Sequence, residues 1–210
     1  MPAPPAAKIE IQELRAQDQE QAAALLARAF ESNPLNLAAI QSSDVARRRR
    51  CNLHGMRCLL PVARAHGLVL AASLEGRFAG VLVAAPPDSY PLPAPPLWPR
   101  VRALLSQGFG VARRWREAFE SLDARHPRVP HWYLGTLGVE PALQGRGVGT
   151  ALARRWLTRI DSDGVAAYLE IDRMENLPFY ARLGFRPVAD FHVLGTPVTA
   201  MERAPRAELR

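Results

Sequence analysis

The stretch LGVEPALQGRGVG, residues 137–149, decides how the rest of the chain is interpreted. An apolar run at 131–139 leads into it and predicts a strand that ends before Pro141. An amphipathic pattern from about Gly147 to Asp161 follows and predicts a helix with its arginines toward solvent. The three alternate glycines of the stretch therefore lie in a turn between a strand and a helix.

Alternate glycines let such a turn bend tightly and approach a ligand closely, because no Cβ atoms intervene. The first N–H groups of the helix have no intrahelical acceptor and carry the positive end of the helix dipole. The turn is thus a candidate phosphate site, and Arg146 adds a full charge. Alone, the pattern is equally consistent with a structural turn. It lacks the Lys-Ser/Thr ending of a Walker loop, whereas Glu170 lies near the spacing of a dinucleotide site, so spacing leaves that alternative open.

Residues 137–149 as a whole resemble the acyl-CoA signature of the GCN5-related N-acetyltransferase (GNAT) family, Q/R-x-x-G-x-G/A after a strand with an apolar end. The stretch NLPFYARLGF, residues 176–185, resembles the second landmark of that family, an Asn followed by Y-x-x-x-G-F. The specific resemblance covers about residues 131–188. Its YLE…NLPFY combination is similar to the branch that contains puromycin N-acetyltransferase, whose substrate is not carried over.

The resemblance implies a mixed α/β (α+β) fold with a mostly antiparallel sheet of about seven strands, flanked by helices and splayed at the acyl-CoA site. Local patterns agree with it and predict helices at 18–31, 44–66, 100–124 and 176–183, and further strands at 8–14, 68–74, 78–85, 165–172, 185–194 and 197–203. Seven prolines predict an extended loop at 86–99. We expect one domain at 8–203, a disordered lead at 1–7 and a C-terminal tail at 204–210.

The same resemblance implies acetyl-CoA as the acyl donor. Main-chain groups of the strand at 131–139 would hold the pantetheine arm, and the glycine turn would hold the pyrophosphate. A threonine in the first helical turn would add a hydroxyl contact, and the Asn of the second landmark would reach the pantetheine or the nucleotide end. The expected cofactor-binding residues are Leu137, Gly138, Val139, Gln144, Gly145, Arg146, Gly147, Val148, Gly149, Thr150 and Asn176.

The implied reaction is direct attack of a neutral amine on the thioester. Tyr180 occupies the family's position for the acid that protonates the departing thiolate. Glu170 is the candidate base, because strand alternation places it on one face with Tyr168 and Asp172, although it can equally orient the substrate or be a surface charge. Glu140 is a weaker candidate. The sequence does not identify the acceptor amine, and we favour a small molecule over a protein. We expect residues 35–66 and 86–126 to form its pocket.

Composition bears on the alternatives. The net charge of +7 suggests an anionic partner, but the run Arg47 to Arg50 lies in a helical pattern, which favours a solvated face over a nucleic-acid patch. Scattered histidines predict no metal site, and Cys51 and Cys58, seven residues apart in one helix, are expected to stay reduced. The rival of another class is a protein that keeps this fold and binds acyl-CoA as a sensor or scaffold.

The absence of a long apolar run and of a secretory signal pattern predicts a cytoplasmic protein that does not enter the membrane. A homodimer is compatible with the sequence. We expect four aromatic residues between positions 98 and 119 to pack in the core rather than line a cleft: Trp98, Phe109, Trp115 and Phe119.

Overall fold

A seven-stranded sheet forms the centre of the computed structural model, which describes residues 8–87 and 89–205. The strands lie in the order β1-β2-β3-β4-β5-β7-β6, and β4–β5 is the one parallel pair among them. The predicted mixed, mostly antiparallel fold is therefore confirmed. The strand bounds are β1 Ile9–Glu13, β2 Leu68–Leu74, β3 Arg77–Ala85, β4 His131–Val139, β5 Ala166–Ile171, β6 Arg186–Val193 and β7 Thr196–Arg203.

The predicted lead at 1–7 and residues 206–210 of the predicted tail lie outside the described residues. The single-domain extent of 8–203 stays a prediction. None of the helices within the described ranges is both long and apolar enough to cross a membrane.

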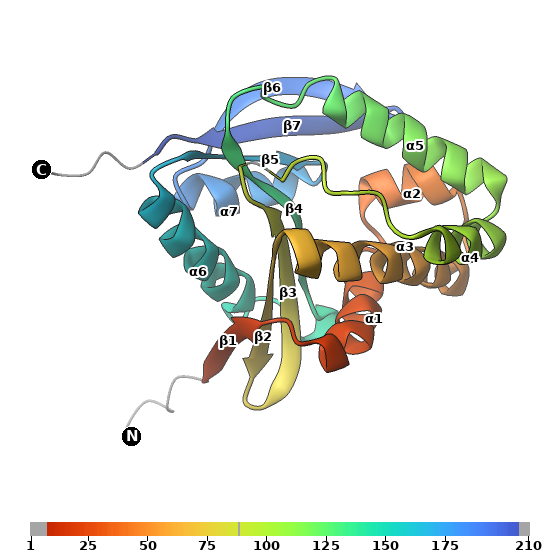
Figure 1. Ribbon diagram of the computed structural model, residues 1–210, viewed down its shortest axis with the longest axis horizontal. Helices are drawn as coiled ribbons and strands as arrows, with labels where there is room; N and C mark the ends of the chain where they lie inside the picture. Colours follow the sequence, from red (N-terminus) through yellow and green to blue (C-terminus); the bar gives the residue numbers. More distant parts are fainter. Residues whose placement is uncertain (1–7, 88, 206–210) are drawn as a thin grey trace, which may run out of the picture.

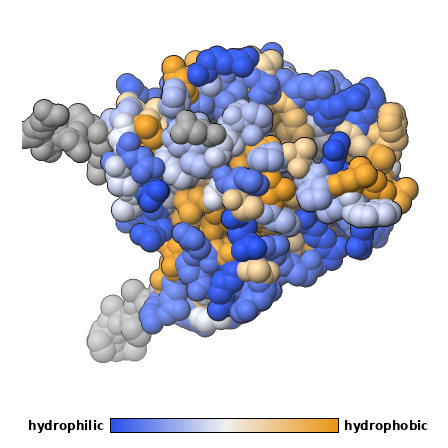
Figure 2. All heavy atoms as spheres, viewed as in Figure 1, coloured by the Kyte–Doolittle hydropathy of each residue, from blue (hydrophilic) through white to orange (hydrophobic). Residues whose placement is uncertain are grey.

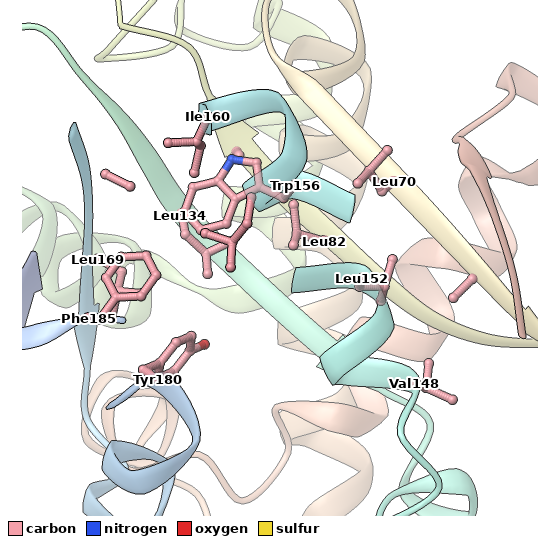
Figure 3. Packing of buried hydrophobic residues seen from close by; sticks show 14 of the residues in the cluster. Leu70, Leu82, Leu134, Val148, Leu152, Trp156, Ile160, Leu169, Tyr180 and Phe185 are labelled. Carbon is pink, nitrogen blue, oxygen red and sulfur yellow. The ribbon is translucent and has the colours of Figure 1, made fainter. Parts of the chain in front are cut away.

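Helices cover both faces of the sheet (Figure 1). α1 and α3 pack on one face over a cluster that contains Val81, and α6 and α7 pack on the other over a cluster that contains Leu82 (Figure 3). Val81 and Leu82 reach opposite layers because side chains alternate along a strand. The helix bounds are α1 Gln19–Ala29, α2 Pro34–Ile40, α3 Val45–His66, α4 Leu97–Gln107, α5 Phe109–Asp123, α6 Val148–Asp163 and α7 Leu177–Arg182.

Two glycines allow α1 and α6 to lie close to the middle of the sheet. A Cβ on Gly80 of β3 would come within 2.9 Å of Val148 and 3.0 Å of Leu152 in α6. A Cβ on Gly138 of β4 would come within 2.5 Å of Leu26 in α1. Any larger side chain would push a helix off the sheet, so these glycines hold α6 and α1 against β3 and β4.

Two helix predictions were wrong. Residues 100–124 are not one helix, because Gly108 adopts a positive φ of 86° between α4 and α5. α4 begins at Leu97, inside the predicted loop, since Pro99 falls in the first turn, where a missing N–H breaks no helical bond. The other difference is α2, a helix that the sequence analysis did not predict and that begins at Pro34. Asn33 caps it by accepting a hydrogen bond from the amide of Asn36.

The prediction that the four aromatics pack in the core holds for one of them. Trp115 is partly buried against Val111 and Val198. Trp98, Phe109 and Phe119 are 76%, 73% and 61% exposed, so for them it was wrong. In Figure 2, apolar side chains gather at the edge where α4 and the start of α5 lie in Figure 1.

The two cysteines lie in α3, one buried and the other half-buried, and both are free, as predicted. α3 begins at Asp44, whose carboxylate accepts from the amide of Ala46, and it ends at Gly67. A Cβ on Gly67 would lie 2.7 Å from the carbonyl oxygen of Ala84, so the chain can pass from helix into β2 only with a glycine there.

Candidate active site

Strands β4 and β5 pair over their first halves and then diverge. The register joins His131–Leu134 to Ala166–Leu169. Beyond these pairs, β4 continues to Val139 beside β3, while β5 continues beside β7. The sheet is therefore open along the second half of β4, which confirms the predicted splay. We call this gap the β4–β5 opening.

A β-bulge marks the start of the opening. In the register with β3, Thr136 lies opposite Val83 and Leu134 lies opposite Ala84, so Gly135 has no partner. A bulge bends its strand and increases the local twist. The extra residue thus re-aims the main-chain groups that follow it along the open edge.

The main-chain groups of Leu137 and Val139 point into the opening. In an antiparallel pair, alternate residues direct both of their main-chain groups to the same neighbour. The amide of Glu140 donates to the carbonyl of Ala79 in β3 at 2.9 Å, so Val139 and Leu137 face away from β3. The side-chain amide of Gln144 donates to the carbonyl of Val139 at 3.3 Å. Gly138, between Leu137 and Val139, directs its main chain toward β3. Its part in cofactor binding stays a prediction.

The glycine turn connects this edge to α6. Gly145 and Gly147 have positive φ angles of 74° and 83°, and a Cβ on Gly145 would meet no atom within 4 Å. Gly147 is the N-cap of α6 and offers no side chain to the first helical amides. Its carbonyl accepts from the amide of Ala151 at 2.9 Å, and the amides before Ala151 are the ones that a helix start leaves without an intrahelical acceptor. The turn is thus open, exposed and rich in N–H donors.

The other residues expected at the cofactor surround this turn. Arg146 is exposed, with its guanidinium 3.9 Å from the carboxylate of Glu75. The side chain of Val148, the first residue of α6, is buried in the core, so only its main chain can meet a ligand. Thr150 is half-buried in the first turn of α6, and Asn176 is exposed where α7 begins. A Cβ on Gly149 would lie 3.5 Å from Val139 and 4.0 Å from Phe179, which brings β4, α6 and α7 together at this point.

Tyr180 lies in α7 on the α6 side of the sheet and is buried (Figure 3). Its ring packs edge-on against Phe179 and Phe185, with centroids 4.9 and 6.1 Å away. Burial raises the pKa of its phenol well above the usual value, and the negative charge of Asp172 raises it further. Tyr180 therefore keeps its proton at neutral pH.

Glu170 lies on the other face of the sheet, because successive residues of β5 alternate. It is the first residue of β5 beyond the last β4–β5 pair, so it lies where the opening starts. Its side chain is 6% exposed. Burial and then the charge of Glu170 raise the pKa values of the phenols of Tyr133 and Tyr168, which identifies these two as its close neighbours.

Glu170, Tyr133 and Tyr168 belong to a polar cluster, which we call the Glu170 cluster, together with His126, His131 and Tyr90. The sequence analysis did not nominate the last three. His126 and His131 lie 2.9 Å apart through their Nε2 atoms, and Tyr90 stacks on His126 with ring centroids 3.5 Å apart. Tyr90 comes from the proline-rich loop, His126 from the segment after α5, and His131 from β4. These three residues belong to no common sequence motif. No local pattern therefore predicts that their side chains lie in contact.

Two other carboxylates have structural partners. Glu140 forms a two-pronged ion pair with Arg28 of α1, at 2.7 Å to its Oε2, so it is not free to act as the weaker candidate base. Asp172 accepts from the side chain of Asn33 at 2.9 Å and from the amide of Leu35 at 2.8 Å. It thus anchors the start of α2 to the end of β5.

Two pockets lie beside the Glu170 cluster. One, of about 350 Å³, is lined by residues that include Tyr90, Asp123, His126 and His131. The other, of about 460 Å³, is lined by residues that include Arg125, Tyr168, Asp190 and Glu202. Both border the face of the sheet to which Glu170 points, and the first draws on the predicted acceptor region 86–126.

Within the described parts of the chain, no three or more His, Cys, Asp or Glu side chains gather so as to hold a metal ion. In the basic run, Arg48 donates to the carbonyls of Glu31, Ser42 and Ser43, and Arg49 pairs with the carboxylate of Glu31. Half of this run therefore ties α3 to the segment before it, and Arg47, Arg49 and Arg50 are exposed, in line with the predicted solvated helix face.

Comparison with known proteins adds an independent result. The sequence profile described as Acetyltransferase (GNAT) family matches residues 47–185. An uncharacterized N-acetyltransferase of Schizosaccharomyces pombe is 28% identical over 183 residues, which cover 82% of this chain and 72% of that protein. Similarity to the puromycin N-acetyltransferase branch stays a prediction.

Solved structures share the fold. The chain is similar to a crystal structure described as histone acetyltransferase HPA2 and related acetyltransferase from Corynebacterium glutamicum, with 26% identity, a TM-score of 0.69 and coverage of 96% of this chain and 99% of that one. It is also similar to the PaiA N-acetyltransferase from Thermoplasma acidophilum in complex with coenzyme A. That match has 16% identity, a TM-score of 0.58 and coverage of 94% of this chain and 99% of that one, and it shows likeness of fold.

Proposed function

Because the chain belongs to the GNAT family of acetyltransferases, we propose that it transfers an acetyl group directly from acetyl-CoA to an amine of a small molecule or peptide. N-acetyltransferase activity with acetyl-CoA as donor follows from the family; the direct route and the class of acceptor are the proposal. The observation that carries it is the β4–β5 opening, with an exposed glycine turn at one end and Glu170 at the other.

The residues present fit the pyrophosphate of the donor. Free amides at the start of α6 are the donors that a phosphate requires, and the left-handed glycines leave room for its approach. Arg146 is exposed and held only by a 3.9 Å contact with Glu75, so its guanidinium is free to turn toward a phosphate. Thr150 lies in the first turn of α6, and Asn176 lies exposed just before α7, whose Phe179 would be 4.0 Å from a Cβ on Gly149.

The open edge of β4 fits the pantetheine arm, whose amides can pair with main-chain groups. Leu137 and Val139 direct such groups into the opening, and the Gln144 side chain occupies the carbonyl of Val139 in the meantime. The donor supplies a thioester, which an amine can attack without further activation of the acyl group. An arm that runs along this edge from the turn brings the thioester to the region of Gly135 and Glu170.

The protein then has two proton tasks, and its two candidate groups approach the end of the opening from opposite faces. Glu170 takes a proton from the acceptor ammonium, so that the nitrogen can attack the thioester carbonyl. Tyr180 keeps its proton at neutral pH and donates it to the sulfur as the C–S bond breaks. Placement on separate faces lets the amine arrive on one side while the thiol departs on the other.

Steady-state kinetics with acetyl-CoA and a panel of amines tests this proposal. We expect one free thiol for each N-acetylated amine, and double-reciprocal lines that intersect as both substrates are varied. Parallel lines with a burst of thiol would indicate a covalent acyl-enzyme and contradict direct transfer. Tight binding of coenzyme A without turnover on any amine would instead identify a sensor or scaffold.

A further inference from the structure

A row of buried polar side chains leads away from Glu170, and the reaction described above does not use it. Oε1 of Glu170 lies 3.9 Å from Nδ1 of His126, and the two side chains are only 6% and 5% exposed. Nε2 of His126 lies 2.9 Å from Nε2 of His131, whose Nδ1 lies 2.7 Å from the carbonyl oxygen of Val129. Among the described residues, neither Glu170 Oε1 nor His126 Nδ1 has a hydrogen-bond partner.

The direction of each hydrogen bond in this row follows from the carbonyl of Val129, which can only accept. Nδ1 of His131 must therefore carry a hydrogen. Burial lowers the pKa of His131, so its ring is neutral near pH 7 and its Nε2 accepts. His126 must then donate through its own Nε2, and in its neutral form it presents the lone pair of Nδ1 to Glu170.

Two acceptors thus face each other across a gap of 3.9 Å in a buried site. An ionised carboxylate oxygen and an unprotonated imidazole nitrogen both lack a hydrogen, and their burial without a donor costs free energy. One hydrogen on either atom removes this mismatch, because the carboxyl O–H or the imidazole N–H can then donate to the other when the gap closes to hydrogen-bond distance. The geometry therefore leaves a place for one hydrogen between Oε1 of Glu170 and Nδ1 of His126.

We propose that His126 receives the proton that Glu170 removes from the acceptor ammonium, and so acts as a positioning and relay residue behind the base. This inference rests on the proposed function, because it needs an amine at Glu170. The ammonium gives one proton to the carboxylate, which leaves a neutral amine and a carboxylic acid. Once the two side chains close the 3.9 Å gap to hydrogen-bond distance, the acid O–H passes that proton to Nδ1 of His126, which restores the carboxylate and forms an imidazolium.

The surroundings of His126 suit an imidazolium. Tyr90 stacks on its ring, and Tyr133 and Tyr168 approach with centroids at 4.8 and 5.1 Å, where π electrons attract a cation. None of these phenols competes for the proton, since burial raises the pKa of Tyr90 to about 12 and those of the other two well above their usual value. The titratable groups that act on the pair or on the rings around it include Tyr90, Asp123, His131, Tyr133, Tyr168 and Glu202, and Arg128 lines the same pocket as both histidines.

The row also has an exit for the proton. His126 and His131 both line the pocket of about 350 Å³, together with Asp123 and Arg128. The imidazolium can lose its Nε2 proton to Nε2 of His131, whose Nδ1 proton then leaves the Val129 carbonyl for solvent in this pocket. One proton leaves for each amine that enters, and each histidine is left as its other neutral tautomer. Exchange of ring protons with solvent in the pocket restores the starting tautomers before the next turnover.

The substitution His126→Gln tests the relay, because Gln keeps an N–H that can donate to His131 but has no group that takes up a proton. We expect kcat/KM for the amine to fall about 10-fold or more at pH 7, with the affinity for coenzyme A unchanged within about twofold. The deficit should shrink as the pH approaches the pKa of the amine, because the acceptor then arrives neutral. Added imidazole should restore part of the rate.

The matched control is His192→Gln, an exposed histidine of β6, which should leave the pH profile unchanged. A His126→Gln enzyme with wild-type rates, or with a deficit that is the same at every pH, would overturn the relay while the acetyl transfer itself stands. If the wild-type enzyme acetylates no amine at any pH, the proposed function fails first. Thermal unfolding of both variants shows whether a uniform deficit reflects lost packing.

Discussion

In the proposed reaction Tyr180 gives a proton and Glu170 takes one, and the two side chains lie on opposite faces of the sheet. Tyr180 belongs to the apolar layer under α6 and α7, where burial and Asp172 hold its proton in place. Glu170 belongs to a polar cluster on the other face, beside His126 and Tyr133. A single side chain could not keep its proton at neutral pH and also accept one, so two residues in different surroundings are needed.

The first prediction concerns Tyr180→Phe, which removes the phenol oxygen and keeps the ring. We expect kcat to fall about 100-fold or more, because the departing sulfur loses its proton donor, while the affinity for acetyl-CoA changes less than about twofold. Stopped assays at saturating substrates measure kcat, and calorimetry measures affinity. An unchanged kcat would show that Tyr180 is not the acid. Because the ring is retained, a fall in kcat is not explained by a folding defect.

The second prediction concerns Glu170→Gln, which keeps the shape of the side chain and removes the base. We expect the acidic limb of the wild-type profile of kcat/KM to depend on this base. In the variant this acidic limb should move upward toward the pKa of the amine, about 10 for a lysine-like acceptor. A limb that stays where the wild type has it would clear Glu170 of base duty and leave it a role in orienting the substrate.

The third prediction concerns pH and stability. Burial lowers the pKa of His131 below its usual 6.5, so between 6.5 and its native value the unfolded chain binds a proton that the folded chain does not. The free energy of unfolding should therefore decrease as the pH falls below about 6.5. Urea unfolding between pH 5 and 8 measures this slope, and His131→Gln should flatten it. An equal slope in the variant would assign the effect to other groups.

At the scale of elements, the turn between β4 and α6 is the proposed anion site, and its glycines are under different constraints. Gly145 and Gly147 adopt left-handed backbone angles that leave their amides open, whereas Gly149 lies inside the first helical turn against Val139. Gly164, at the other end of α6, is also left-handed, with φ of 64°, but lies far along the helix from the turn. This provides a matched pair for experiment.

The fourth prediction compares Gly147→Ala with Gly164→Ala. Each places a Cβ at a positive φ and should cost about 1–2 kcal/mol of stability. Only Gly147→Ala disturbs the amides at the start of α6, so it should weaken coenzyme A binding about 10-fold or more, and Gly164→Ala should not. Calorimetric titration of both variants with coenzyme A measures the two affinities. Equal losses of affinity would mean that the turn has no special part in binding.

The sequence predicted the elements with strong periodicity and missed those that depend on single caps. The strand at 131–139 and the helix after it followed from alternation, apolar spacing and the glycines between them. α2 was missed because its start depends on one Asn side chain and one proline, which also suit a turn. Gly108 separates α4 from α5 through its backbone angle, which the apolar pattern on either side does not reveal.

For the candidate site too, the sequence predicted the residues that lie in local motifs and missed those that long-range contacts bring together. Glu170 and Tyr180 could be nominated because each lies within a local motif. His126 could not, because its contacts with Tyr90 and Glu170 join segments that are distant in the chain, and loops of no regular period bring them together. The exposed aromatics of α4 and α5 were misjudged for a related reason, since apolar spacing does not reveal whether another layer covers a helix.

At the scale of the whole molecule, the split sheet explains why binding and chemistry occur at one place. The glycine turn lies at one end of the β4–β5 opening and the Glu170 cluster at the other, so one extended donor can meet both. Part of the net charge of +7 is used in contacts between α3 and the segment before it, and Arg146 remains exposed at the turn. A cytoplasmic location and a homodimer stay predictions from the sequence.

The central claim is that main-chain amides at the start of α6 hold the diphosphate of coenzyme A. Isothermal titration of the wild-type protein with coenzyme A and, separately, with pantetheine tests it most directly. We predict one site for coenzyme A and an affinity at least about 100-fold weaker for pantetheine, which lacks the diphosphate. Equal affinities, or no heat with coenzyme A at millimolar concentration, would contradict the account.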